Sequence, residues 1–337
     1  MNRLVCRGIA SDKKMGPYLN VKRLEFDITY RCNSHCRHCH VEEEKRRARP
    51  AAIAPDLAVA IIRQVTQAYR PASVMTFGGE PLLYPEIVCA IHVAARERGI
   101  PRREIITNAG WPRAAGPAWT VAQRLAASGV NQVAVSVDAF HQEHISLEVV
   151  ERNVRAYLDA GIPRMAWNPC WVVGPTADNP YDEHTRTVLA ALAHLPVATG
   201  VGNILQPAGR ARQHLGEYLP PRQPLPTGSC ADVPYAGRLD AVDCISIDPT
   251  GEVYICWDWS IGNAATQDLG ELLDRYDPYA IPEARAILTG GMAALRALAQ
   301  ARGHELDPTG YDSICDMCRS LRQAGTRPAP RRDHAPE

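Results

Sequence analysis

The sequence has no excess of charge of either sign and no long apolar run. Its 337 residues include 37 Lys and Arg and 37 Asp and Glu, so the formal net charge is zero. Proteins that bind nucleic acid or membrane surfaces through charge carry a clear basic excess, which is missing here. No apolar stretch approaches the roughly 20 residues that span a bilayer, and the N-terminus lacks the apolar segment of a secretory signal. We therefore expect a cytoplasmic protein that binds neither nucleic acid nor membrane.

Cysteine, in contrast, is abundant and unevenly distributed. Thiols stay reduced in the cytoplasm, so eleven cysteines indicate metal or redox use rather than disulfides. Three lie within residues 32–39 and five between residues 230 and 318, whereas Cys6, Cys89 and Cys170 stand alone. Two groups at opposite ends of the chain predict two metal sites.

Residues 23–210 alternate short β-rich runs with longer runs of helical periodicity. This alternation predicts an α/β fold with a parallel sheet and right-handed crossovers. Six strands suit a partial (β/α)6 TIM-like barrel, because the segment is too short for eight. The expected strands are residues 24–29, 73–77, 104–107, 132–138, 164–168 and 201–207.

The remainder of the chain predicts a linker and a small second domain. Residues 211–243 are rich in Pro, Gly and Arg and are expected to form the linker. The run "CISIDPTGEVYIC" predicts a hairpin that turns at residues 249–251. With helices over 268–303 and the "CDMC" motif, residues 244–321 would form a C-terminal iron–sulfur domain of a β-hairpin plus helices. Residues 1–22 would be an extension and residues 322–337 a disordered tail.

The first cysteine motif, Cys32-x3-Cys36-x2-Cys39, directly follows the first expected strand. With His40 it could form a structural Cys3His zinc site. Its position favours another interpretation, because α/β sheets of this kind place their chemistry at the carboxyl ends of the strands. Three thiolates can hold three irons of a [4Fe–4S] cluster and leave the fourth iron open to a ligand.

A second motif, Gly78-Gly79-Glu80-Pro81, follows the second expected strand. Two glycines let the backbone approach a ligand closely, and Glu80 can accept hydrogen bonds from an ammonium group. Such a turn is common when it stands alone. Beside the cysteine motif, at the end of the neighbouring strand, it predicts one shared site.

Together the two motifs resemble those of the radical S-adenosylmethionine (SAM) enzymes, a resemblance that covers residues 22–210. It implies that Cys32, Cys36 and Cys39 hold a [4Fe–4S] cluster whose fourth iron chelates SAM. It also implies an electron donor such as flavodoxin or ferredoxin, reductive cleavage of SAM, and a 5′-deoxyadenosyl radical that takes hydrogen from a substrate.

The resemblance implies further cofactor contacts. His38 would lie against the adenine, the Gly-Gly-Glu-Pro motif against the methionine part, and Ser136 and Asp138 near the ribose and the methionyl carboxylate. "TNAG" resembles the family's TNG element although Ala109 intrudes, and "QPAGRA" (206–211) resembles a later SAM-lining element. The cofactor-binding candidates are His38, Gly78, Gly79, Glu80, Pro81, Asn108, Ser136, Asp138 and Asn168.

Two polar stretches receive a plainer interpretation. His141 and His144 in "DAFHQEH" invite a catalytic role, but a polar loop and helix cap is the simpler expectation. The run "EEEKRRAR" (42–49) is expected to be a solvated loop.

In the second cysteine group, the hairpin turn predicts that Cys244 and Cys256 face each other on one side of the ribbon. Together with Cys315 and Cys318 they supply four thiolates, which suit zinc or a [4Fe–4S] cluster. Gly251-x4-Cys256 followed by CxxC resembles the SPASM/twitch extension of radical SAM enzymes, which implies one auxiliary [4Fe–4S] cluster. Cys244 is nearer to the glycine, and Cys230 farther from it, than is usual in the family. Cys230 could therefore replace Cys244 or add to it.

These patterns predict a reaction class. A cluster with four cysteines has no open iron, so it would transfer electrons and support an oxidation. If Cys230 is not a ligand, it could donate a hydrogen atom as in an epimerase, and Cys170 is a second donor candidate. We expect oxidative or epimerising modification of a peptide or protein residue. The alternatives are a dehydrogenase or epimerase of a small sugar or amino-acid derivative and, from another class, a non-catalytic metal-binding scaffold.

Overall fold

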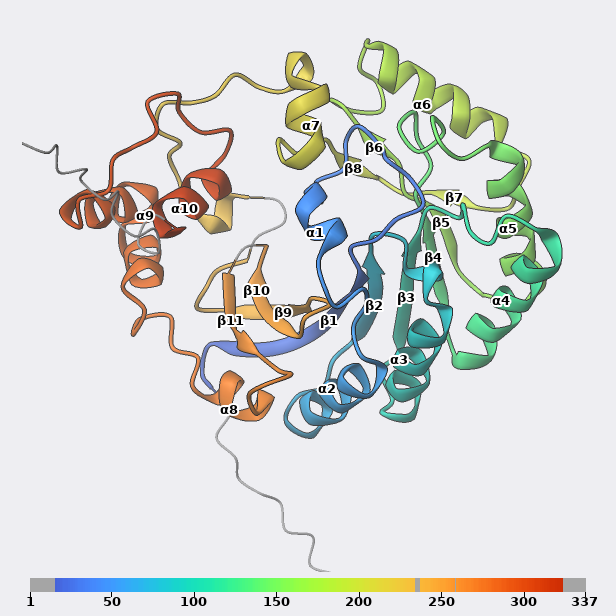
Figure 1. The fold of residues 1–337 in the computed structure, drawn as a ribbon, viewed down its shortest axis with the longest axis horizontal. Coiled ribbons are helices and arrows are strands. Elements are labelled where there is room, and N and C mark those ends of the chain that lie inside the picture. Colours follow the sequence, from blue (N-terminus) through green and yellow to red (C-terminus); the bar gives the residue numbers. More distant parts are fainter. Residues whose placement is uncertain (1–15, 234–236, 258, 324–337) are drawn as a thin grey trace, which may run out of the picture.

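The computed structural model describes residues 16–233, 237–257 and 259–323. The strands of the barrel form an open arc with helices on its outside (Figure 1). Its parallel strands are β1 (Leu19–Thr29), β2 (Ser73–Gly78), β3 (Arg102–Thr107), β4 (Gln132–Val135), β5 (Met165–Trp167) and β7 (Ala198–Thr199). This arrangement confirms the predicted α/β partial barrel. The expected disordered tail lies almost wholly outside the described residues.

Five helices cover the outer face of this sheet (Figure 1). Their apolar residues recur at helical spacing; in α2, for example, Ala58, Ile61, Ile62 and Val65 are buried. Proline opens three of the helices, where its missing N–H costs nothing. The helices are α2 (Pro55–Ala68), α3 (Pro85–Glu97), α4 (Ala115–Ser128), α5 (Leu147–Asp159) and α6 (Pro180–Ala191).

The two faces of the barrel differ in polarity, as the first strand illustrates. Leu24 and Phe26 of β1 are fully buried in the core beneath the helices. The alternate residues Arg23, Glu25 and Asp27 lie on the opposite face and are partly exposed. Because side chains alternate along a strand, β1 presents polar and partly exposed residues to the inside of the arc.

The strand expected over residues 201–207 was wrong in extent. The chain first forms the short β7 beside β5. It then forms β8 (Asn203–Ile204), which pairs with β6 (Cys170–Trp171) in a separate two-stranded sheet. Gly202 lies between them with φ +72°, where a Cβ atom would collide with the carbonyl of Pro169. A glycine-dependent bend therefore interrupts the strand.

The C-terminal hairpin joins the barrel sheet. β9 (Val242–Ile247) and β10 (Glu252–Cys256) are antiparallel, with a turn at Gly251, and β11 (Trp259–Asn263) follows. β9 also pairs in parallel with β1, so the sheet order is β11-β10-β9-β1-β2-β3-β4-β5-β7. The expected second domain thus shares a continuous sheet with the core.

The remaining helices are α1 (Glu43–Arg47), α7 (Gly209–His214), α8 (Leu269–Asp274), α9 (Pro282–Ala301) and α10 (Ile314–Gln323), with 3-10 turns at Pro81–Leu83, Gly216–Tyr218 and Cys230–Asp232. The expected linker contains most of α7 and two of these turns. Of the remaining helices, α8 packs beside α2, and α9 packs against α10 (Figure 1). None of the helices described is both long and apolar enough to cross a bilayer.

Candidate functional site

The first three cysteines lie on the segment that leaves the carboxyl end of β1, residues 30–41, here called the cysteine loop. Cys36 is 6% exposed, and Cys32 and Cys39 are half-buried. The backbone N–H of Cys39 donates to the carbonyl of Cys36 at 3.2 Å. Burial, together with the nearby Glu80, raises the pKa of the Cys32 thiol to about 11. A metal that binds here must therefore displace protons, as thiolate ligation requires.

The Gly-Gly-Glu-Pro loop packs directly on the start of the cysteine loop. The N–H of Gly79 donates to the carbonyl of Thr29 at 2.6 Å, and that of Glu80 to the carbonyl of Arg31 at 2.9 Å. Gly78 has φ +121°, and a Cβ atom on Gly79 would collide with the carbonyl of Arg31. Both glycines are thus required by contact between two loops. Their approach to a ligand stays a prediction.

Glu80 links the ends of β2 and β3. Its fully buried carboxylate accepts hydrogen bonds from the N–H of Leu82 at 3.0 Å and the hydroxyl of Thr107 at 2.8 Å on Oε1. Oε2 accepts from the N–H of Asn108 at 2.9 Å. Burial raises the pKa of Glu80 to about 7, although these hydrogen bonds oppose the shift. Glu80 therefore fixes the two loops relative to each other.

Asn108 connects the end of β3 to the cysteine loop. Its side-chain Nδ2 donates to Oδ1 of Asn33 at 2.8 Å and to Sγ of Cys32 at 3.6 Å, and its Oδ1 accepts from the N–H of Gly110. Ala109, which departs from the TNG pattern, has a left-handed φ of +49° and is fully buried. The ends of three neighbouring strands thus meet around Cys32.

Asp138 organises the loop after β4. Its buried carboxylate accepts from the backbone N–H groups of Phe140, His141 and Cys170 at 2.9–3.0 Å and from Nδ1 of His141 at 2.9 Å. Burial would raise the pKa of Asp138, but the charge and hydrogen bonds of His141 outweigh it and hold the pKa below its usual value. These partners are all protein groups, so contact with the ribose stays a prediction.

Ser136 and Asn168, the other two candidates at these strand ends, are partly exposed. The backbone N–H of Ser136 donates to the carbonyl of Thr107 at 2.8 Å, and that of Asn168 donates to the carbonyl of Val135 at 2.7 Å. These hydrogen bonds continue the pairing of the sheet. Their side chains therefore lie at the carboxyl edge of the sheet, where the predicted cofactor would bind. Pro81 is buried and opens a 3-10 turn.

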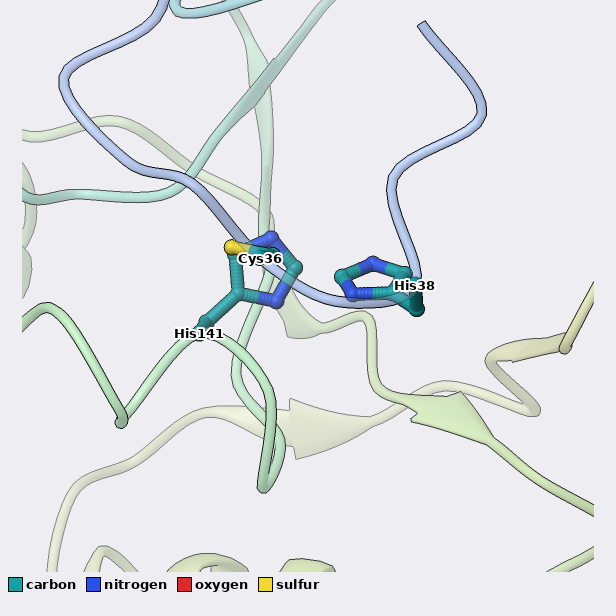
Figure 2. Close-up of side chains that lie close together, drawn as sticks. All are labelled: Cys36, His38 and His141. Carbon is teal, nitrogen blue, oxygen red and sulfur yellow. The ribbon is translucent and has the colours of Figure 1, made fainter. Parts of the chain in front are cut away.

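His141, for which the sequence favoured a plain polar loop, lies beside the cysteine loop. One potential ligand atom from each of Cys36, His38 and His141 lies within 4.8 Å of the other two (Figure 2). The ring centroids of His38 and His141 are 4.9 Å apart. Burial lowers the pKa of His38 to about 3. His144 lies 3.9 Å from Glu143 and is not in this group. The spacing of Asp138 and His141, three positions apart, was the available signal.

Four of the five cysteines of the second group line one cavity. It is lined by Cys230, Cys256, Cys315 and Cys318, together with Trp257, Trp259, Arg212, Arg319 and Arg322. Burial, together with the nearby Cys256 and Cys315, raises the pKa of Cys230 to about 11. Burial likewise raises the pKa of Cys318 to about 12, with Arg322 acting against it. The four thiols therefore lie close enough to affect one another.

Cys244 lies elsewhere. On β9 it is opposite Arg23 of β1, and its thiol is hydrogen-bonded to Glu25. It is not among the described residues that line the four-cysteine cavity. Of the two alternatives that the sequence leaves open, the geometry brings Cys230, not Cys244, to the other three. Cys170 is 8% exposed and packs in a small apolar cluster with Cys36.

Comparisons with known proteins find a family profile and solved structures that match this chain. The family profile described as Radical SAM superfamily matches residues 26–188. A search of curated protein sequences finds no match. Among solved structures, "Native anSMEcpe with bound AdoMet" is 12% identical, with a TM-score of 0.51 over 91% of this chain and 97% of that chain. "BtrN in complex with AdoMet and 2-DOIA" is 15% identical, with a TM-score of 0.42 over 80% and 88% of the two chains. The first of these shows a shared fold along almost the whole chain.

Proposed function

We propose that residues 26–188, which match the Radical SAM superfamily profile, form a radical SAM domain and that Cys32, Cys36 and Cys39 hold its [4Fe–4S] cluster. Cluster and SAM together supply reductive cleavage and radical chemistry, with an electron from a donor of the flavodoxin or ferredoxin kind. The observation that carries this assignment is the cysteine loop itself. It leaves three thiols at the carboxyl edge of β1, fastened by backbone hydrogen bonds to the Gly-Gly-Glu-Pro loop.

The residues around the loop divide into those that meet SAM and those that hold the loop. We assign contact with the methionine part to the Gly78–Pro81 loop and contact with the adenine to His38. Ser136 and Asn168 are partly exposed at the same edge and remain available to SAM. We assign Asp138 to orienting His141 rather than to the ribose, because its carboxylate already accepts four protein hydrogen bonds.

An auxiliary [4Fe–4S] cluster held by Cys230, Cys256, Cys315 and Cys318 is the second part of the proposal. A tetrahedral zinc ion with bonds of about 2.3 Å would need the sulfur atoms about 3.8 Å apart. Among the described residues, three potential ligand atoms lie within 4.8 Å of one another in the group Cys36, His38 and His141. No three sulfur atoms of the four cysteines lie within 4.8 Å of one another in the same way. Their wider spacing suits a polynuclear cluster, and Arg322 beside them would offset its negative charge.

This ligand set favours oxidation over epimerisation. If Cys230 binds iron, it is not free to donate a hydrogen atom to a substrate radical. Cys170 is a poor substitute, because it is buried against apolar residues behind the cysteine loop. An auxiliary cluster with four cysteines would instead accept an electron from the substrate radical. We propose oxidative modification of a peptide or protein residue in the cytoplasm as the reaction class.

The test is anaerobic reconstitution with iron and sulfide, followed by SAM and a strong reductant. We expect 5′-deoxyadenosine and about eight irons per chain, falling to about four in the Cys32/Cys36/Cys39→Ala variant. Bound zinc, little iron and no deoxyadenosine would return the protein to a metal-binding scaffold. The substrate class is then tested by adding candidate peptides and following deoxyadenosine formation above the level without substrate.

A further inference from the structure

Two arginines from distant parts of the chain bind the carbonyls of the cysteine loop. Arg46 belongs to the charged run that was expected to be solvated, yet its side chain is only 7% exposed. Its guanidinium donates to the carbonyl of Ser34 and lies 2.9 Å from Nδ1 of His35. The neighbouring Arg47 is 79% exposed, as the sequence suggested.

Arg210, near the start of α7, reaches the same loop. Its Nε donates to the carbonyl of Cys36 and its Nη2 to that of His35, both at 3.2 Å. Its backbone N–H donates to the carbonyl of Cys39 at 2.9 Å. The preceding Gly209 permits this approach: it has φ +54°, and a Cβ atom there would lie 2.6 Å from the carbonyl of His40.

The burial of Arg46 requires an explanation. Taking a guanidinium out of water is costly unless it is paired and hydrogen-bonded. Among the described residues, the nearest carboxylate oxygen belongs to Glu43, 4.0 Å away, and that side chain is 42% exposed. In the folded chain, the cost of burying the Arg46 guanidinium is therefore offset mostly by hydrogen bonds to neutral groups of the cysteine loop. A negatively charged cluster on this loop would supply the missing counter-charge, since Cys32 lies within electrostatic reach of Arg46.

We infer that Arg46 and Arg210 are positioning residues that clamp the cysteine loop from two sides and hold it ready for its cluster. Together they bind the carbonyls of Ser34, His35, Cys36 and Cys39, which lie within the three-cysteine motif and include two of its cysteines. The forked guanidinium suits this task because one side chain can hold two points of the loop at fixed geometry. The inference rests on the proposed ligation by Cys32, Cys36 and Cys39.

The first test measures retention of the cluster. A chelator is added, and the loss of iron is followed by EPR spectroscopy. The signal that changes on addition of SAM is measured, because it reports the first site and not the auxiliary site. We expect Arg46→Gln and Arg210→Gln to lose this signal about 10-fold faster than the unmodified protein, because removal of outer-shell partners typically lowers metal affinity by about 10- to 100-fold. Arg47→Gln, the exposed neighbour, is the matched control and should behave as the unmodified protein. Equal rates in all four proteins would overturn the clamp.

Arg46→Lys separates charge from geometry. If the clamp depends on the forked guanidinium, this variant loses iron nearly as fast as Arg46→Gln. Iron loss at the rate of the unmodified protein would mean that Arg46 supplies only charge, and would overturn its positioning role. Circular dichroism and gel filtration establish that each variant is folded.

A second readout needs no metal. In the iron-free protein we expect amide hydrogens of residues 32–39 to exchange faster in Arg46→Gln and Arg210→Gln, with no change in Arg47→Gln. Unchanged exchange at this loop would overturn the clamp even if the protein bound iron as proposed. Faster exchange in a protein that never binds a SAM-responsive cluster would support the clamp and contradict the proposed function.

Discussion

The two cysteine sites are built in different ways. The three thiols of the first lie on one loop, and the ends of β2 and β3 hold that loop through the Gly-Gly-Glu-Pro backbone, Glu80 and Asn108. The four thiols of the second come from a 3-10 turn, the end of β10 and the helix α10. The spacing of the ligands is therefore set by local sequence in the first site and by the tertiary fold in the second. The two should respond differently to substitution.

The largest difference is expected in SAM cleavage. Cys36→Ala should yield no 5′-deoxyadenosine above the protein-free background, because the cluster that binds SAM loses one of its three ligands. Cys318→Ala should still form deoxyadenosine without substrate, because the first site keeps its own ligands. Chromatographic quantification of deoxyadenosine after anaerobic incubation distinguishes the two. Loss of cleavage in Cys318→Ala, with the protein folded, would show that the sites are not independent.

Iron content separates the two candidate ligands of the second site. Cys230→Ala should fall from about eight irons per chain to about four, and Cys244→Ala should retain about eight. The reason is geometric: Cys230 lines the cavity with the other three thiols, whereas Cys244 is hydrogen-bonded to Glu25 on the barrel strand. The reverse result would mean that the hairpin pairs its own two cysteines, as the sequence suggested.

The same contrast explains what the sequence could predict. The cysteine loop and the Gly-Gly-Glu-Pro motif are local patterns, and the strand expected at 73–77 lies within β2 (Ser73–Gly78). The hairpin was also predicted, but its parallel pairing with β1 was not, because register between segments over 200 residues apart leaves no local pattern. The same pairing places Cys244 beside Arg23, a neighbour that the hairpin pattern alone does not reveal. Arg46 was missed for a related reason: in a run of charges, burial of one side chain depends on what packs over it.

The stability of the fold should depend more strongly on the buried pair Asp138 and His141 beside the first site than on the thiols of the second site. Asp138→Ala removes the partner of His141 and should lower the free energy of unfolding of the metal-free protein by about 3–5 kcal/mol. The lowered pKa of Asp138 makes its contribution present above the unfolded value of about 3.9 and lost as the pH falls further.

His141 sets the upper limit of this pH window. Burial opposes protonation of His141, but Asp138 outweighs it and raises the pKa, so this contribution is lost as the pH rises through the folded-state value, above about 6.5. Denaturant titrations of the unmodified protein and of Asp138→Ala between pH 3 and 9 measure the free energy of unfolding of each. The two values should differ most in the window between the unfolded pKa of Asp138 and the folded pKa of His141. A difference that stays constant across the whole range would contradict an ion pair and indicate packing alone.

The smallest effect concerns contact between the two loops of the first site. A methyl group at Gly79 would meet the carbonyl of Arg31, a backbone atom that cannot move without shifting the cysteine loop. Gly79→Ala should therefore cost about 1–3 kcal/mol of unfolding free energy. Gly116→Ala in α4 is the matched control: nothing lies within 4 Å of its added Cβ, so it should gain about 0.5–1 kcal/mol through helix propensity. If Gly79→Ala is as stable as the unmodified protein and holds the same iron, the two loops can separate, and the first site is less rigidly built than the hydrogen bonds between Thr29, Arg31 and the Gly-Gly-Glu-Pro loop imply.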